Sequence, residues 1–267
     1  MFPIISANSA AASAGNDEGI FGFGWASGWA VSDITNLVSN AGVIASDVSG
    51  VGTARSYLAA CEYGEDKGIF GYGRISPPPY AVSMTNLVSN TGVVASDVSG
   101  VGSARKEVAA CGYGEDKGIF GFGRISPPPY AVSMTNLVSN TGVVASDTAG
   151  VGQSRKECGA CWYGEDVKDK GIFAFGTLGD VPTHTRVTTT NLVSNAGVIA
   201  SDGAGAGTAR GSVAACEYGQ DKAIFGFGWV GSFTNVTNLV SNAGVVASDQ
   251  AATTGTTRSG LAACSFN

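Results

Sequence analysis

The sequence repeats itself with a period near 50 residues, and this period constrains the fold more than any other feature. The hexapeptide TNLVSN occurs five times, with starts 50, 50, 55 and 47 residues apart, at Thr35, Thr85, Thr135, Thr190 and Thr237. A period of this length with several short apolar segments in each unit indicates a β-propeller blade rather than a helical solenoid. No stretch shows a sustained apolar period of 3.6 residues, so helices are not expected.

Each unit contains four segments with the character of strands. In one unit they are residues 105–114, 117–123, 132–140 and 141–147, separated by turns rich in glycine, asparagine and aspartate. Small residues such as those of VAAC suit an innermost first strand, where blades converge, and the glycines of KGIFGFG allow neighbouring blades to approach closely. We therefore expect an all-β fold of four-stranded antiparallel blades.

The two ends of the chain are complementary pieces of one unit. Residues 17–50 carry a second, third and fourth segment without a first, whereas residues 258–267 carry a first segment alone. Joined, they complete a fifth blade and hide sheet edges that would otherwise be exposed. We expect residues 1–267 to form a single five-bladed propeller domain, closed by pairing of the N- and C-terminal segments. Residues 1–15 are expected to be an extension, and the other repeats start near residues 55, 105, 155 and 210.

Two resemblances are carried by these strings. RSGLAAC and KGIFGYG, followed after a loop by a third strand, are similar to the kelch type of propeller repeat, although the kelch double glycine is Gly-aromatic-Gly here. The tandem of TNLVSNTGVVASD with GVGTAR also resembles repeats in predicted structural proteins of marine bacteriophages. The second resemblance implies a fibre, spike or decoration protein, folded in the host cytoplasm and located in the virion; a cytoplasmic location is the alternative.

The composition excludes several classes of function. Hydrophobic residues make up 44% of the chain and charged residues 13%, which is typical of a globular protein. The net charge of −6 argues against a nucleic-acid partner. No run of eighteen apolar residues occurs, so membrane insertion is not expected, and the first residues lack the basic region of a secretory signal.

The cysteines are expected to be free thiols. Cys61, Cys111, Cys161, Cys216 and Cys264 occupy equivalent positions of successive units, where adjacent copies should lie beyond the roughly 7 Å Cα separation that a disulfide allows. Cys158 and Cys161 share one strand, which is poor disulfide geometry. The chain is therefore expected to fold in a reducing compartment.

Nothing in the sequence indicates catalysis. His184 is the single histidine and lies in an irregular segment, so it cannot form a histidine metal cluster. The acidic pairs at residues 65–66 and 115–116 lie in YGEDK turns beside lysine, and the VAAC-type segments carry no carboxylate in their cores. We expect no catalytic residue, no metal and no cofactor, and the chain is not expected to be an enzyme.

A repeated arginine and a repeated aspartate flank the connection between units. Each aspartate closes a fourth segment, and the arginine opens the next first segment eight or nine residues later. The arginines form either structural ion pairs with these aspartates or an anion-binding ring at one mouth of the central channel. They are Arg55, Arg105, Arg155, Arg210 and Arg258.

Binding, if the protein binds a partner, is expected on the face formed by the loops that vary between repeats. Antiparallel order places the loops after the second strands and the fourth-to-first connections at the same end of each blade, opposite the nearly invariant YGEDK and SN(A/T)G turns. Aromatic side chains on this face suit a sugar ring or a protein neighbour. They are Trp25, Trp29, Tyr80, Tyr130, Trp229 and Phe233.

These features predict a non-catalytic structural or adhesion module. Its partners would be other virion proteins or a host surface glycan or protein, and homo-oligomers are compatible with this role. The alternatives are a glycan-binding, lectin-type propeller and a cytoplasmic kelch-type adaptor for protein partners.

Overall fold

The computed structural model describes residues 18–77, 80–127, 130–165, 168–179, 184–250 and 255–263. Within these ranges the chain is built from strands, with one short 3-10 helix, η1 (Ser27–Trp29). The strands form several small antiparallel sheets, so the expected all-β class is confirmed. Residues 1–15 of the expected extension lie outside the described residues.

Four of the five repeats fold into a three-stranded antiparallel sheet with the central strand supplied by the KGIFG-type segment. The sheets are β3-β4-β5, β6-β7-β8, β9-β10-β13 and β14-β15-β16. In the same order, their strands are Ala59–Tyr63, Lys67–Gly71 and Thr85–Val88; Ala109–Tyr113, Lys117–Gly121 and Thr135–Val138; Gly159–Tyr163, Lys170–Ala174 and Thr190–Val193; Ala214–Tyr218, Lys222–Trp229 and Phe233–Val240.

Two further pairs of strands complete the fold. The first repeat contributes β1 (Gly19–Trp25) and β2 (Val31–Val38), which form a two-stranded sheet. The longest repeat adds a small ribbon of β11 (Thr177–Leu178) and β12 (Thr185–Arg186). This ribbon accounts for part of the extra length in the 55-residue spacing.

The expectation of a regular fourth strand is wrong. The VVASD segment pairs with the third strand through isolated backbone bridges, Val88↔Val94 and Thr85↔Val98 in one unit, and the pattern recurs in the others. The side chain of Asn86 replaces part of the missing ladder, because its amide donates to the Ala95 carbonyl at 3.0 Å and to Asp97 Oδ1 at 2.9 Å. These side-chain hydrogen bonds hold the segment beside the sheet without a continuous strand.

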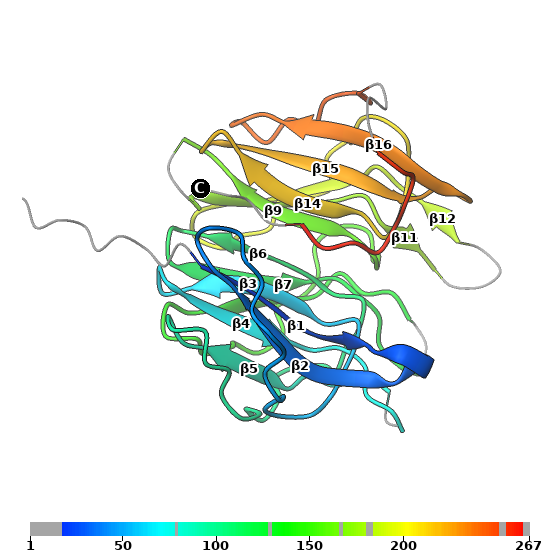
Figure 1. Ribbon diagram of the computed structural model, residues 1–267. Helices are drawn as coiled ribbons and strands as arrows, with labels where there is room; N and C mark the ends of the chain where they lie inside the picture. The colour runs from blue at the N-terminus through cyan, green and yellow to red at the C-terminus, as the bar shows by residue number, and fades with distance from the viewer. Residues whose placement is uncertain are drawn as a thin grey trace, which may run out of the picture.

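The first strands lie side by side through the middle of the molecule, as their small residues predicted. Strand β3 contacts β6, β6 contacts β9, and β9 contacts β14. Figure 1 shows this succession, with the third strands β5 and β16 on the outside. Neighbouring units pack closely here, because a Cβ placed on Gly118 of β7 would come within 2.6 Å of Cys61 Sγ in β3 of the preceding unit.

One aromatic contact repeats at each described junction between units. An aromatic residue of one unit packs edge-to-face on the phenylalanine of the next, with ring centroids 5.1 to 5.4 Å apart. At Gly71 a Cβ would lie 2.7 Å from the Phe120 ring, so glycine is required for this approach. The pairs are Phe23–Phe70, Tyr72–Phe120, Phe122–Phe173 and Phe175–Phe225.

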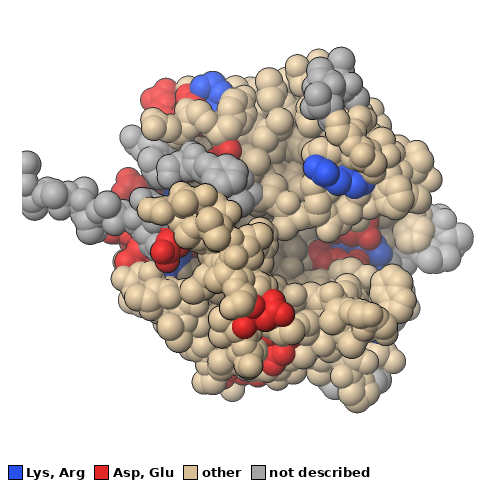
Figure 2. Space-filling model, in the orientation of Figure 1, with Lys and Arg blue, Asp and Glu red and all other residues tan. Residues whose placement is uncertain are grey.

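The unit that the two chain ends were expected to share is incomplete in the structure. The β1-β2 sheet has no first strand, and residues 255–263 form no strand with β1. In Figure 1 the red C-terminal segment runs between the upper part of the molecule, with β14 to β16, and the lower part, with β1 and β2. Figure 2 shows a hollow between these parts, with acidic and basic side chains in its depth. Residues 264–267 of the expected closing strand lie outside the described residues.

Candidate functional site

The two sets of variable loops meet at one end of each complete unit. Arg74, which follows β4, bridges to Ser56 before β3 and to Ala81 before β5. At the opposite end, the two nearly invariant turns meet where the Asn90 amide donates to Asp66 Oδ2 at 3.1 Å. The antiparallel order therefore separates variable loops from invariant turns, as the sequence predicted.

An aromatic cluster stands on this variable face around Trp25. The ring of Trp25 packs edge-to-face on Trp29 at 6.0 Å and on Tyr57 at 5.9 Å. The guanidinium carbon of Arg74 lies 5.2 Å from the Trp25 ring centroid and 5.1 Å from that of Tyr80. We call these five residues the Trp25 cluster.

The Trp25 cluster is open to solvent. The side chain of Trp29 is 81% exposed, and Tyr57 and Tyr80 are exposed as well. Trp29 lies in η1 with a φ of 61°. This left-handed conformation is uncommon for a bulky residue, so the exposed ring stands on a backbone conformation that tryptophan rarely adopts. A flat, exposed aromatic surface next to a cation can stack on a sugar ring or a planar group of a partner.

The other predicted aromatic residues form two separate groups on the same kind of loop. Tyr130 lies over the guanidinium of Arg124 at 5.1 Å, and Trp229 packs on Phe233 at 5.0 Å. No ring contact joins these groups to the Trp25 cluster among the described residues. The predicted aromatic residues therefore form three separate patches on the variable loops.

Sequence analysis missed Tyr57. It occupies the position two residues after the repeated arginine, where other units carry Glu107, Glu157, Ser212 and Gly260. All five residues have a φ between 53° and 65°. The sequence signal that could have found it is the variation of the residue type at this position, two residues after the repeated arginine.

This same position builds a chain of backbone hydrogen bonds from unit to unit. The amide of Glu107 donates to the Tyr57 carbonyl at 2.9 Å, Glu157 donates to Glu107 at 3.4 Å, Ser212 to Glu157 at 3.0 Å, and Gly260 to Ser212 at 3.2 Å. We call these residues the inner chain. It joins consecutive units on the variable-loop side of the first strands.

A charged cluster accompanies the inner chain in the two units with the sequence RKE. Lys156 Nζ lies 3.6 Å from Glu107 Oε2, and Arg124 Nη1 lies 3.8 Å from Glu107 Oε1. Burial raises the pKa of Glu107, although Lys156 and Arg124 oppose this effect. Because the carboxylate is neutralised by two cations, its position favours a structural role.

Four of the five repeated arginines are fully buried. Arg55 donates from Nε to the Tyr72 carbonyl at 3.0 Å and from Nη2 to Asn86 Oδ1 at 2.5 Å. Its guanidinium carbon also lies 4.3 Å from the Phe23 ring centroid, in the preceding unit. Arg55, Arg105, Arg155 and Arg210 have no exposed surface.

This burial contradicts the anion-ring alternative for these four residues and supports structural ion pairs. The expected pairing across the short connecting loop is wrong, however. Arg55 lies 3.6 Å from Asp97, at the end of its own unit, rather than beside Asp47. In the same way Arg155 lies 3.9 Å from Asp202. Arg258 differs from the other four because it is exposed.

The electrostatics agree with a structural arginine. Burial lowers the pKa of Arg55 to about 10, with Asp97 partly offsetting the effect, so the side chain stays protonated at neutral pH. Burial alone would raise the pKa of Asp97, but hydrogen bonds from Thr53 and Asn86 and the charge of Arg55 hold it below the ordinary value. The pair is therefore ionised in the folded protein near pH 7.

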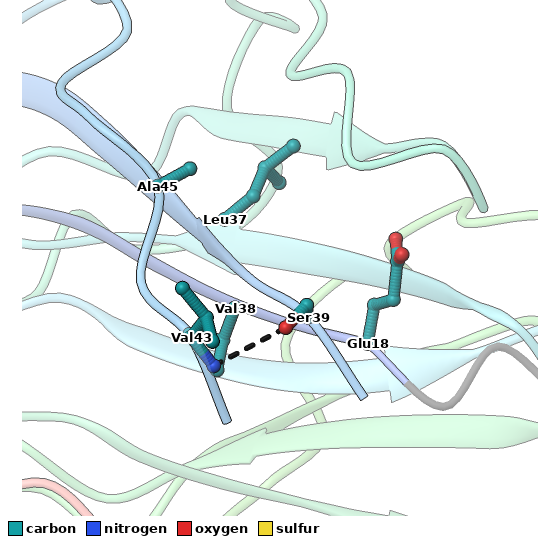
Figure 3. A pocket seen from close by; sticks show the side chains of 6 residues that line it. All are labelled: Glu18, Leu37, Val38, Ser39, Val43 and Ala45. Atoms are coloured by element: carbon teal, nitrogen blue, oxygen red, sulfur yellow. Dashed lines mark hydrogen bonds between the residues drawn. The ribbon is translucent and has the colours of Figure 1, made fainter. Parts of the chain in front are cut away.

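Two open pockets lie beside the third strands. One, of about 230 Å³, is lined by Glu18, Leu37, Val38, Ser39, Val43 and Ala45. Figure 3 shows that four of these side chains are aliphatic and that the polar ones are Glu18 and Ser39, whose Oγ accepts a hydrogen bond from the Val43 amide at 3.2 Å. The other lies between Tyr163, Leu192 and the turn at Asn242. Neither arrangement brings several polar groups onto one point, as a small-molecule site requires.

The described residues contain no group of three or more histidine, cysteine, aspartate or glutamate side chains placed to hold a metal ion. His184 is exposed in its loop, and Asp66 and Asp116 each pair with the adjacent lysine in the YGEDK turn. No helix in the described part of the chain is long and apolar enough to cross a membrane. Comparison with models of protein families and with curated proteins found no match to this chain.

Proposed function

We propose that the chain closes into a five-bladed β-propeller and serves as a non-catalytic structural or adhesion module. The variable-loop face, and the Trp25 cluster above all, is the surface that contacts the partner. The observation that carries this proposal is the position of Trp29, 81% exposed in a left-handed turn on the variable-loop face. Exposed aromatic residues on variable loops are a common basis of recognition.

The closed ring is supported by residues at the two ends that lack the neighbours their equivalents have. Phe21 is 45% exposed, whereas the equivalent Phe120, Phe173 and Phe225 are fully buried against the preceding unit. Tyr218 is 36% exposed, whereas Tyr63, its counterpart in another unit, is 4% exposed. Closing the ring would place Phe21 against Phe227 and the turn at Gly42 against Tyr218, which repeats the contacts of the other junctions.

The setting that we propose is a virus particle, in which the protein is a fibre, spike or decoration component. The support is the resemblance of the tandem repeats to structural proteins of marine bacteriophages, together with the free thiols Cys61, Cys111, Cys158 and Cys161, which fit folding in a reducing cytoplasm. Partners would be other virion proteins or a glycan or protein on a host surface. Mass spectrometry of purified particles tests the setting directly.

A lectin-type function is the second candidate, and the geometry of the Trp25 cluster favours it. Two indole rings and two phenols beside Arg74 resemble the apolar platforms on which pyranose rings stack. A glycan array separates the two candidates, because a lectin would retain a defined class of sugar whereas a purely structural protein would not.

The experiment that tests the binding face compares variants from its two ends. We expect Trp29→Ala and Trp229→Ala to weaken attachment to the partner by at least tenfold, since a central aromatic anchor commonly contributes about 2 kcal/mol. The melting temperature should stay close to that of the parent protein. Glu65→Ala and Glu115→Ala, in the invariant turns, are the matched controls and should leave attachment unchanged. If the glutamate variants lose attachment and the tryptophan variants keep it, the proposed face is wrong.

A further inference from the structure

In each complete unit a backbone amide near the start of the unit donates to the aspartate at its end. In one unit, Arg105 donates from Nη2 to Asn136 Oδ1, and Ser103 donates from its amide and its hydroxyl to Asp147 Oδ2 at 2.9 and 2.8 Å. Gly102 precedes them with a φ of 78°, and a Cβ there would overlap Asp147. We call this arrangement of glycine, hydroxyl residue, arginine, asparagine and aspartate the clasp.

The amide-to-aspartate contact of the clasp recurs in the other three complete units, with Gln153 at the hydroxyl position of one of them. The arginine-to-asparagine bond recurs between Arg55 and Asn86, whereas Oδ1 of Asn191 and of Asn238 accepts no hydrogen bond from the described residues. The amide of Thr53 donates to Asp97 Oδ2 at 2.9 Å, that of Gln153 to Asp202 at 2.9 Å, and that of Thr208 to Asp249 Oδ1 at 2.9 Å. The glycines before these residues all have a positive φ, and a Cβ on any of them would overlap the aspartate. They are Gly52, Gly152 and Gly207.

The first unit carries the acceptor half of a fifth clasp. The amide of Asn36 donates to Asp47 Oδ1 at 2.8 Å and to the Ala45 carbonyl at 3.2 Å, as its counterparts do. Asp47 is exposed like Asp97 and Asp147, but Asn36 is only half-buried, whereas Asn86 and Asn136 are fully buried under an arginine. The acceptor pair is therefore formed without an arginine contact, among the described residues, of the kind that Asn86 and Asn136 have.

The C-terminal segment carries the donor half. Arg258 already makes the contacts that each repeated arginine makes to the preceding unit: its carbonyl accepts from Gly228 at 2.9 Å, and its guanidinium carbon lies 4.3 Å from the Phe227 ring centroid. Gly255 has a φ of 99°, positive like that of each clasp glycine, but a Cβ there would meet nothing within 4 Å. Thr256 stands at the position of Thr53 and Ser103.

The inner chain gives a third pair of unmatched groups. Four of its bonds connect Tyr57, Glu107, Glu157, Ser212 and Gly260 in order. Among the described residues, the Tyr57 amide makes no backbone hydrogen bond of this kind, and it is the donor that a fifth bond, to the Gly260 carbonyl, would use. If each step turns by one fifth of a circle, as in the proposed closed ring, the first and last members lie next to each other.

We propose that residues 255–260 of this chain dock onto its own first unit and form the fifth clasp, with Arg258 on Asn36 and Asp47 and Thr256 on Asp47. This inference rests on the proposed closed ring and adds the residues that lock it. The occupant is the same chain rather than a second copy, for two reasons. Arg258 already contacts Gly228 and Phe227 of the preceding unit, and the inner chain lacks only one bond to form a closed ring. A second copy would have to separate these contacts to reach the same site.

A double-mutant cycle tests the clasp, with thermal unfolding as the measurement. We expect Asp47→Ala and Arg258→Ala each to lower the melting temperature, and the double variant to fall no further than the worse single variant, because both changes remove one shared contact. Asp97→Ala combined with Arg258→Ala is the matched control, and its effects should add. Additive effects in the Asp47–Arg258 pair would overturn the proposal.

Two further measurements separate the remaining outcomes. The mass in solution at low and high protein concentration should be that of a monomer; a concentration-dependent dimer that the Asp47→Ala change dissociates would show a second copy in the clasp and overturn the intramolecular assignment.

Deletion of residues 258–267 tests the ring itself. If the deletion destabilises the protein but the Asp47–Arg258 pair shows no coupling, the ring closes without this clasp and only the further inference fails. Loss of partner attachment in Trp29→Ala is independent of both results.

Discussion

The guanidinium carbon of Arg105 lies 4.6 Å from the ring centroid of Tyr72, although the two residues belong to neighbouring repeats. The same arginine donates to the Met134 carbonyl at 2.8 Å and to Asn136 within its own repeat. One buried side chain therefore connects a unit to its neighbour and to its own third strand. Because a buried arginine lies over an aromatic ring of the preceding unit at four successive junctions, these junctions are held by cations inside the protein as well as by apolar packing.

The first prediction concerns this buried arginine. We expect Arg105→Ala to lower the free energy of unfolding by about 3–5 kcal/mol, because it leaves buried acceptors without a donor and opens a cavity. Arg186→Ala, on the partly exposed strand β12, is the control and should change stability by less than about 0.5 kcal/mol. Urea unfolding of both variants measures the difference. Equal effects would mean that the buried arginines are not the junctions of the fold.

The second prediction uses two equivalent glycines. A Cβ on Gly121 would lie 2.8 Å from the Phe173 ring, so we expect Gly121→Ala to destabilise the protein by about 1–3 kcal/mol. Gly226 holds the same position in the last complete unit, but its nearest neighbour in the structure is Thr237 at 3.4 Å. In a closed ring Phe21 would pack there, and Gly226→Ala should then cost as much as Gly121→Ala. A neutral or stabilising Gly226→Ala would show that the seam is open.

The third prediction concerns pH. Asp97, Asp147 and Asp249 have a pKa below the ordinary value in the folded protein: burial opposes this, but hydrogen bonds from the clasp residues outweigh it. A carboxylate with a depressed pKa stabilises the fold above its unfolded pKa and loses this contribution as the pH falls through the folded pKa. The contribution of these aspartates to stability should therefore be nearly constant between about pH 8 and pH 5 and should fall below about pH 4. Unfolding curves of the parent and of Asp147→Asn, which should show a weaker dependence, provide the measurement.

The fourth prediction concerns the thiols. Cys111 and Cys161 are buried between first strands, and burial raises the pKa of both thiols well above the usual range. In the folded protein they should react with a thiol reagent far more slowly than an exposed cysteine, since the thiolate is the reactive form. After denaturation without reductant, all six cysteines of the chain should react. Two or more unreactive cysteines would reveal a disulfide and exclude folding in a reducing compartment.

Much of the fold could be predicted because it depends on local signals that repeat. The 50-residue period, the AAC segments and the Gly-aromatic-Gly strings correctly placed the first strands side by side and the glycines at the junctions. The separation of variable loops from invariant turns follows from antiparallel order alone. None of these inferences required knowledge of which distant residues meet.

The errors arose where long-range packing decides the outcome. Asp47 is closest to Arg55 in the sequence, yet Arg55 pairs with Asp97, because folding each unit into a meander returns its end to its own start. The fourth segment had a strand-like composition, but it forms no continuous strand. The side-chain amide of Asn86 donates to the Ala95 carbonyl and to Asp97, in place of backbone hydrogen bonds between the third and fourth segments. Tyr57 joined the aromatic cluster through a left-handed backbone that its sequence did not announce.

Hydrogen–deuterium exchange tests the closed ring most directly, because the chain contains its own reference. Residues 19–24 of β1 and residues 118–123 at β7 have the same sequence, GIFGFG, so their intrinsic exchange rates are alike. Strand β7 is paired on both sides, whereas β1 is paired on one side in the structure. If the C-terminal segment closes the ring, residues 19–24 should exchange as slowly as residues 118–123. Deletion of residues 258–267 should then speed the exchange of residues 19–24 and leave that of residues 118–123 unchanged. Fast exchange of residues 19–24 in the full chain, unchanged by the deletion, would contradict closure.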